Sequence, residues 1–378
     1  MKIRMTSLIA ILMMLLSAAV VHAAGVQRIH EIKSPLFASP AIVKAGADLT
    51  VKIAVPETLS VVEICLNGVD DTSIHNCLKY GEPGREGDLA VFKVKVPVNF
   101  TPALYDLAVN FSDNNWDYQL HAVKVVKEFK RDFYIVQLTD IHFNCQDFLK
   151  KDMNRIRRRL LLEINKLNPE FVMFTGDIGL DPETYKWDYI YGFEEFAGRL
   201  RVPMYMIPGN HEQYYLKTND EEVDGDELWN ITYGPKYLSF DYGNLHVIGM
   251  NTFDWPRKWR NRRWKEAAFY GSLFNAEISD EQWKWALADL DSAKARGQGL
   301  LAFTHIPIEM LMGGKKLGIL KDTLTVQGPD QDQFAAALAE RGCETLFVGH
   351  MHYNTVKKFG KLTEILTKGA GAAGGDTN

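Results

Sequence analysis

The fold is decided by the stretch Phe133-Tyr-Ile-Val-Gln-Leu138-Thr139-Asp140-Ile141-His142. In it, an apolar run of strand length ends in an Asp-x-His motif. Four later apolar runs end in a similar way. They lead into Gly176-Asp177, Gly209-Asn210-His211-Glu212, Thr304-His305 and Gly349-His350-Met351-His352. Helical patterns at 151–167, 279–295 and 331–341 alternate with these strands, so this part of the chain is predicted to be α/β. The first pattern places Ile156 on an apolar side, with basic residues on the other side, and the second opens with Ser279 and Gln282, which suit a capping box.

Half of the ten histidines follow these five strands. In an α/β sheet the site-forming loops lie at the carboxyl ends of the strands, so side chains at these positions are expected to converge. A lone histidine after a strand is usually a surface or core residue. Five histidines that each follow an apolar strand are hard to attribute to chance. We therefore predict that they belong to one common site.

The residue types favour two metal ions. Imidazole suits Zn, Fe, Mn or Ni, and carboxylate and amide oxygens suit harder ions. No cysteine is needed, which argues against a structural zinc site. The Asp-x-His and His-x-His spacings place both side chains of a pair on one side of an extended segment. A carboxylate that bridges two ions about 3.5–4 Å apart supports activation of water and in-line displacement at phosphorus.

Together these motifs resemble the series found in calcineurin-like metallophosphoesterases, in the same order and over roughly residues 132–373. The resemblance implies two facing mixed sheets flanked by helices, with the metal ions at one edge. It also implies a metal-dependent phosphoric ester hydrolase in which a metal-bound hydroxide attacks phosphorus.

The resemblance assigns a role to each motif residue. Asp140, His142 and His352 would hold the first ion, Asn210, His305 and His350 would hold the second, and Asp177 would bridge them. His211 would not be a ligand. It would face the substrate and protonate the leaving group or stabilise charge, and imidazole suits this work because its pKa lies near 6.5.

Two departures separate the chain from particular branches of the family. Protein Ser/Thr phosphatases carry an acidic residue three positions after the bridging Asp, where this chain has Leu180, with Asp181 one position later. The partner that orients His211 is therefore left open. Purple acid phosphatases need Tyr at the Leu180 position and lack the histidine of the first motif, so His142 argues against that branch.

The region before the first motif has a different pattern. Short alternating runs at 49–55, 90–96, 104–111 and 118–126, separated by turn signals, predict strands and no helix. We expect a β-sandwich of immunoglobulin-like size at residues 24–128, ahead of the phosphoesterase domain at 129–378. A structural or docking role is expected for the sandwich, because no chemical motif stands out in it.

Residues 1–23 have the pattern of a secretory signal peptide. Lys2 and Arg4 precede an apolar run from Leu8 to Val21, and Val21-His22-Ala23 fits the small-residue cleavage rule. The run is short for a membrane span, which needs about 20 residues, so an uncleaved anchor is the less favoured alternative. The protein is therefore expected to be exported, to the periplasm or out of the cell, with no stable membrane span.

Export would place the four cysteines in an oxidising compartment. Cys65 and Cys77 are candidates for a disulfide bridge, and burial as small apolar side chains is the alternative. Cys145 follows one predicted strand and Cys343 precedes another. These are opposite ends of a parallel sheet, so that pair is not expected to bond.

A basic stretch is the candidate for substrate choice. Residues 257–265 hold six Lys or Arg in nine, with tryptophans between them. Arg257, Arg260 and Trp259 are the candidate contacts to an anionic phosphate, a base or a lipid headgroup. The alternative is a solvated loop whose tryptophans pack on the body. The net charge of −5 argues against a nucleic-acid polymer as partner.

The sequence thus predicts an exported dinuclear phosphoesterase that hydrolyses small phosphate mono- or diesters, with Mn, Fe, Zn or Ni as the metal. A phosphodiesterase or nucleotidase-like enzyme specialised for nucleotides or lipid headgroups is the nearest alternative. A non-catalytic binding protein would carry broken metal motifs, and none is broken. A metalloprotease would carry a His-Glu-x-x-His motif, which the sequence lacks.

Overall fold

The computed structural model describes residues 29–143, 153–180, 182–219, 221–261, 275–319 and 322–369. The predicted signal peptide, Cys145, Asp181 and the end of the basic stretch lie outside these residues. Within them, no helix is long and apolar enough to cross a membrane.

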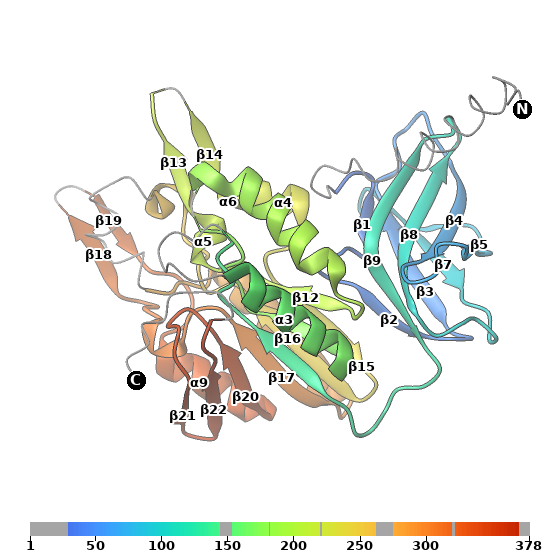
Figure 1. Cartoon of the computed structure of the whole chain (residues 1–378). Coiled ribbons are helices and arrows are strands. Elements are labelled where there is room, and N and C mark those ends of the chain that lie inside the picture. The colour runs from blue at the N-terminus through green and yellow to red at the C-terminus, as the bar shows by residue number, and fades with distance from the viewer. Residues whose placement is uncertain are drawn as a thin grey trace, which may run out of the picture.

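The N-terminal region contains strands and no helix between residues 29 and 126 (Figure 1). One sheet has the order β1 (Ile32–Ser34), β3 (Asp48–Ile53), β7 (Leu89–Lys95), β6 (Gly84–Glu86). The other has the order β2 (Ala41–Lys44), β9 (Trp116–Val126), β8 (Leu104–Phe111), β4 (Val61–Gly68), β5 (His75–Cys77). Val51 and Phe92 from the first sheet share one core with Leu107 and Val123 from the second. The four predicted strands are confirmed, and the likeness to the immunoglobulin fold stays a prediction.

Among the described residues, the second region contains two sheets of three or more strands. The smaller has β10 (Ile135–Leu138), β11 (Phe171–Phe174) and β12 (Met204–Met206), all parallel. The larger has the order β15 (Leu238–Tyr242), β16 (Leu245–Met250), β17 (Gly299–Thr304), β20 (Cys343–Val348), β22 (Leu362–Leu366), β21 (Thr355–Phe359). Only the larger sheet is mixed, with antiparallel strands at its two edges. Among the described residues, the expectation of mixed sheets is met by the larger sheet, and the smaller sheet has only parallel strands.

The two sheets pack face to face, and this arrangement explains the continuous apolar strands. Phe171 and Met173 on β11 pack against Phe303 of the larger sheet. Val172 and Phe174 point the other way, into the core beneath the helices. A strand that is buried on both faces has no polar side to alternate with its apolar side, so its sequence reads as an unbroken apolar run.

Helices cover the outer faces of both sheets (Figure 1). α3 (Met153–Leu167) and α4 (Tyr185–Glu195) pack on the smaller sheet, and α8 (Asp280–Ala295) and α9 (Gln331–Arg341) pack on the larger. The remaining elements are α5 (Asn210–Gln213), α6 (Gly225–Thr232), η1 (Pro182–Thr184), η2 (Ala197–Arg199), η3 (Arg257–Arg260), η4 (Ile308–Met310), and two hairpins, β13 (Tyr215–Lys217) with β14 (Glu222–Asp224) and β18 (Lys316–Ile319) with β19 (Asp322–Thr325).

The three predicted helices are confirmed, but one predicted cap forms only in part. The Ser279 hydroxyl accepts from the Gln282 backbone N–H at 3.3 Å at the start of α8. The Gln282 side chain does not return to Ser279; it accepts from the Asn251 backbone N–H at 2.7 Å and donates to the Asn251 carbonyl at 2.9 Å. Half of the predicted capping box is therefore replaced by a tertiary contact.

A short segment after β1 joins the N-terminal region to the second region. The Ala38 carbonyl accepts from the Met206 N–H at 2.9 Å. The Phe37 ring lies edge-on to the Phe193 ring, with centroids 5.0 Å apart. The Arg201 Nε lies 3.2 Å from the Asp70 carboxylate across the same junction.

Candidate metal centre

Five loops bring together all seven predicted ligands and His211. Each loop follows a parallel strand: Asp140 and His142 follow β10, Asp177 follows β11, Asn210 and His211 open α5 after β12, His305 follows β17, and His350 and His352 follow β20. The loops also bond to one another, because the Asp140 N–H donates to the Gly176 carbonyl at 2.9 Å and the His142 N–H donates to the Asp177 carbonyl at 3.1 Å.

The first ligand group consists of Asp140, His142, Asp177 and His352, whose donor atoms all lie within 4.8 Å of one another. The His352 Nε2 is 3.0 Å from the Asp140 Oδ1. The His142 Nε2 is 3.5 Å from the Asp177 Oδ2 and 3.4 Å from the His352 Nε2. These are the four residues that the resemblance assigns to one ion and its bridge.

The second ligand group contains Asp177, His305 and His350, again within 4.8 Å. The His305 Nε2 is 3.1 Å from the Asp177 Oδ2. The Asn210 Oδ1 lies 2.9 Å from both the His305 Nε2 and the His350 Nδ1, so it faces the same point. Asp177 therefore belongs to both groups, as expected for a bridging carboxylate.

The donor set of these two groups fits a pair of cations. Imidazole nitrogens, two carboxylates and one amide oxygen converge in these two groups. The outer nitrogens are already oriented, because the His142 Nδ1–H donates to the Gly179 carbonyl at 2.9 Å and the His305 Nδ1–H donates to the Thr175 carbonyl at 2.8 Å. A carbonyl accepts only, so Nδ1 keeps its hydrogen in both residues, and Nε2 is the nitrogen that would give up its proton to bind a metal.

The charges in the metal centre are strongly coupled. Burial alone would raise the pKa of Asp140, but hydrogen bonds from His142 and His352 hold it well below its usual range. Burial opposes charge on His305 as well, yet the Asp177 carboxylate raises the pKa of His305 to about 9. Burial lowers the pKa of His350 to about 3. The carboxylates are thus anionic, as metal ligands must be.

Left-handed backbone at five of the ligand positions gives the loops their shape. Asp140, His142, Asp177, His350 and His352 have φ between 45° and 71°. Non-glycine residues adopt this region rarely, and such conformations concentrate at functional sites where the surroundings hold them. Gly209 contributes a close approach instead, because a Cβ there would lie 2.1 Å from the Asp177 Oδ1.

His211 lies beside the first group, with its ring centroid 4.7 Å from that of His142. Its backbone N–H donates to the Asp177 Oδ1 at 3.0 Å. Its Nδ1–H donates to the Leu180 carbonyl, which answers the open question of its orienting partner. Burial lowers the pKa of His211 to about 4.

Two carboxylates that the sequence did not single out support the loop after Asp177. Glu212 accepts backbone N–H groups from Asp177 at 2.7 Å, Gly209 at 2.8 Å and Gly179 at 2.8 Å. Asp188 on α4 accepts the Leu180 N–H at 2.9 Å. Together they fix the carbonyls that orient His142 and His211. Glu212 was visible in the Gly-Asn-His-Glu run, but Asp188 had no sequence signal.

Arg157 on α3 was also missed. The helical pattern predicted Ile156 on the apolar side and basic residues on the other, but Ile156 is 42% exposed and Arg157 is buried. The Arg157 guanidinium donates to the carbonyls of Ile141 at 2.9 Å and His142 at 2.8 Å. It thereby supports the backbone of the first ligand loop from behind.

The candidate substrate residues lie on η3. Arg260 is buried and its Nη1 is 2.8 Å from the Asp224 Oδ1, and Trp259 is also buried. Arg257 is half exposed, with its Nε 2.9 Å from the Asp224 Oδ2 and its guanidinium carbon 4.5 Å from the Tyr215 ring centroid. This packing indicates a structural role for Arg260 and Trp259. A substrate contact by Arg257 stays a prediction.

Comparison with known proteins agrees with this arrangement. The model of the calcineurin-like phosphoesterase family matches residues 133–354. A curated relative from Arcobacter nitrofigilis, named a probable glycerophosphodiester phosphodiesterase GpdQ, is 38% identical over 99 residues, which is 24% of this chain and 34% of that protein. The chain therefore matches only about a third of that relative's length.

Two solved structures are also similar. Purple acid phosphatase PPD1 from yellow lupin has a TM-score of 0.47 at 11% identity, over 92% of this chain and 66% of that one. A dimetal phosphatase from Danio rerio has a TM-score of 0.45 at 13% identity, over 62% of this chain and 87% of that one.

The matched motifs, their spacing along the chain and their convergence define a class of protein. The chain belongs to the calcineurin-like phosphoesterase family, whose members are metal-dependent phosphoester hydrolases.

Proposed function

We propose that this protein is an exported dinuclear-metal phosphoesterase that hydrolyses small phosphate mono- or diesters. The observation that carries the proposal is the pair of buried ligand groups that share Asp177 and lie beside His211. Two ions held there would supply Lewis-acid chemistry, which activates water and neutralises charge on phosphoryl oxygens.

The side chains around the ions have separate tasks in this proposal. Asp177 fixes the distance between the two groups, because its carboxylate takes part in both. His211 handles the proton of the leaving group. Its Nδ1 is committed to the Leu180 carbonyl, and among the described residues its Nε2 has no hydrogen-bond partner. The Nε2 is therefore the atom that faces substrate and exchanges a proton with it.

A diester preference has support from one relative. The matched segment of GpdQ is 38% identical, and that protein's name describes a glycerophosphodiester phosphodiesterase. We propose that small diesters, with a glycerol-like or other alcohol as the leaving group, are better substrates than monoesters. Monoester hydrolysis and activity on nucleotides are the alternatives.

Side-by-side kinetics test this choice. The metal-loaded enzyme is assayed on bis(4-nitrophenyl) phosphate and on 4-nitrophenyl phosphate, which share one chromophore. We expect kcat/KM to be at least about tenfold higher for the diester, equivalent to about 1.4 kcal/mol in the barrier. A preference for the monoester would overturn the diester assignment alone, and no hydrolysis of either would overturn the function itself. Asp291→Asn, an exposed α8 carboxylate, is the control that should leave both rates unchanged.

A further inference from the structure

A second group of ligand-type side chains lies in the N-terminal region. The sulfurs of Cys65 and Cys77 and one ring nitrogen of His75 lie within 4.8 Å of one another. The antiparallel pairing of β4 with β5 places Cys65 opposite Cys77 and Asn67 opposite His75. Alternate residues of a strand share a face, so all four side chains lie on the same side of this ribbon.

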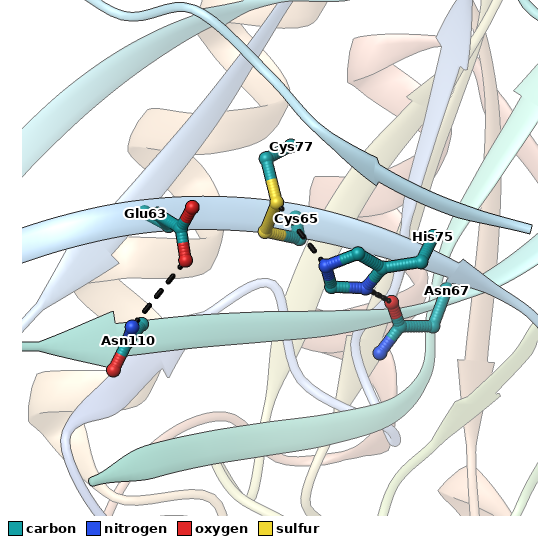
Figure 2. The surroundings of a disulfide bond; sticks show 6 residues. All are labelled: Glu63, Cys65, Asn67, His75, Cys77 and Asn110. Atoms are coloured by element: carbon teal, nitrogen blue, oxygen red, sulfur yellow. Dashed lines mark hydrogen bonds between the residues drawn. A yellow bond between two sulfur atoms is a disulfide. The ribbon is translucent and has the colours of Figure 1, made fainter. Parts of the chain in front are cut away.

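His75 has a defined orientation in this group. Its Nε2 lies 3.4 Å from the Cys77 sulfur, and its Nδ1 lies 2.7 Å from the Asn67 Oδ1 (Figure 2). The amide oxygen accepts only, so Nδ1 carries the hydrogen and Nε2 of the neutral ring presents its lone pair toward the sulfurs. This is the arrangement that outer partners impose on metal-binding histidines.

The structure holds the two cysteines as a disulfide with an S–S distance of 2.04 Å, which confirms the predicted pairing. Cys343 is a free, buried thiol. Cys77 and His75 are exposed on β5, which is an edge strand of its sheet, while Cys65 is buried behind them. An external thiol therefore has access to the Cys77 sulfur.

We propose that reduction of this disulfide creates a metal site in which Cys65, Cys77 and His75 bind one thiophilic divalent cation, such as Zn²⁺. Two thiolates and one imidazole are a recognised zinc ligand set, and a water molecule completes the fourth position. In the oxidised protein the two sulfurs are bonded to each other, so they cannot act as thiolate ligands. This proposal is independent of the proposed phosphoesterase function.

The reduction step balances with an external dithiol as the reductant. One thiolate of the dithiol attacks the Cys77 sulfur, the S–S bond breaks, and Cys65 leaves as a thiolate. The second thiol of the reductant then displaces Cys77, so the reductant becomes a disulfide and the protein gains two thiols. Binding of the cation to the two sulfurs releases two protons.

Cobalt distinguishes this site from the phosphoesterase centre. Sulfur-to-cobalt charge transfer absorbs in the near ultraviolet, and the Asp, His and Asn ligands of the other centre cannot produce it. Full-length protein is titrated with Co²⁺ before and after reduction with a phosphine. We expect the thiolate band only after reduction, at one additional ion per chain, and an increase in Tm of the reduced protein with Zn²⁺.

Matched variants identify the ligands. Cys65→Ser/Cys77→Ser should remove the band although Cys343 remains. His75→Ala should weaken Co²⁺ binding at least tenfold, and Asn67→Ala should weaken it about tenfold, because a partner that orients a ligand affects affinity to this extent. His30→Ala changes an exposed histidine of the same region and should have no effect. Absence of the band in the reduced wild type would show that the pair is only a structural disulfide. Undiminished affinity in His75→Ala would overturn the three-ligand site.

Discussion

Asp177 shows how much a single side chain organises in this centre. Its Oδ2 lies 3.1 Å from the His305 Nε2 and 3.5 Å from the His142 Nε2, and its Oδ1 accepts the His211 N–H. Its own N–H is bonded to Glu212. The Asp177 carboxylate and its backbone are thus held by hydrogen bonds with His211 and Glu212.

Arg157 gives a test of how such supporting contacts position the candidate ligands. Arg157→Ala removes the donor from the carbonyls of Ile141 and His142, and the left-handed backbone of the ligand loop loses its support. We expect metal affinity to fall about 10- to 100-fold, as for other residues that position metal ligands. Competition with a chelator, followed by metal analysis, measures the affinity.

Arg158→Ala is the matched control, because this neighbour on α3 is exposed and pairs only loosely with Glu195 at 3.6 Å. Equal metal retention in the Arg157 and Arg158 variants would mean that Arg157 does not position the loop. Circular dichroism of both variants separates this outcome from unfolding.

At this scale the convergence of the candidate ligands was predictable, and the residues that support them were not. Asp140, His142, Asp177 and the later motif residues follow apolar strands directly, so local sequence was enough. Arg157 and Asp188 act on backbone groups of other elements. Nothing in α3 or α4 distinguishes them from ordinary surface charges, because their partners are defined only once the helices pack.

At the scale of elements, His246 joins three of them. It lies on β16, its Nδ1 is 2.7 Å from the Asp241 carboxylate on β15, and its Nε2 is 2.8 Å from the Asp289 carboxylate on α8. Burial opposes its charge, but these two carboxylates raise its pKa above the usual value. The charged imidazole therefore stabilises the contact between the sheet and its covering helix.

His246→Gln is expected to lower the free energy of unfolding in a pH-dependent way. A pKa that is raised on folding contributes fully below the unfolded value of about 6.5, and the contribution is lost as pH rises through the folded value. The difference between wild type and variant in urea denaturation should therefore be largest near pH 6 and shrink toward pH 9. A difference that grows with pH would contradict this role.

Most strands and helices were predictable from local sequence patterns. β11 and its neighbours are unbroken apolar runs, and α9 ends at a glycine, Gly342, whose φ of 93° suits that residue. The predicted capping box at Ser279 was half wrong, since the Gln282 side chain bonds to the Asn251 backbone. Capping patterns describe local preference, and a buried polar backbone group elsewhere competes for the same side chain.

At the scale of the whole molecule, the two regions share a packed junction. Phe37, from the N-terminal region, is 2% exposed and belongs to the core that contains Phe193 and Tyr233. The sequence placed the boundary between residues 128 and 129 and gave no sign that an earlier segment docks on the second region. That contact joins residues more than 150 positions apart, which periodicity does not detect.

Phe37→Ala should therefore destabilise the protein by about 3–5 kcal/mol, the usual cost of truncating a buried Phe. Urea denaturation followed by tryptophan fluorescence measures this change. Val98→Ala, at a position 83% exposed in the same region, should change stability by less than about 0.5 kcal/mol. Equal stability of the two variants would show that the junction contributes little to the fold.

We propose that two ions bridged by Asp177 perform the hydrolysis, and metal reconstitution tests this most directly. Protein stripped by a chelator is titrated with Mn²⁺ or Zn²⁺ while hydrolysis of bis(4-nitrophenyl) phosphate is followed. We predict no activity without metal, a maximum near two equivalents per chain, and no recovery in folded Asp177→Asn at any metal load. Activity in the stripped protein, or full activity with Asp177→Asn, would contradict the account.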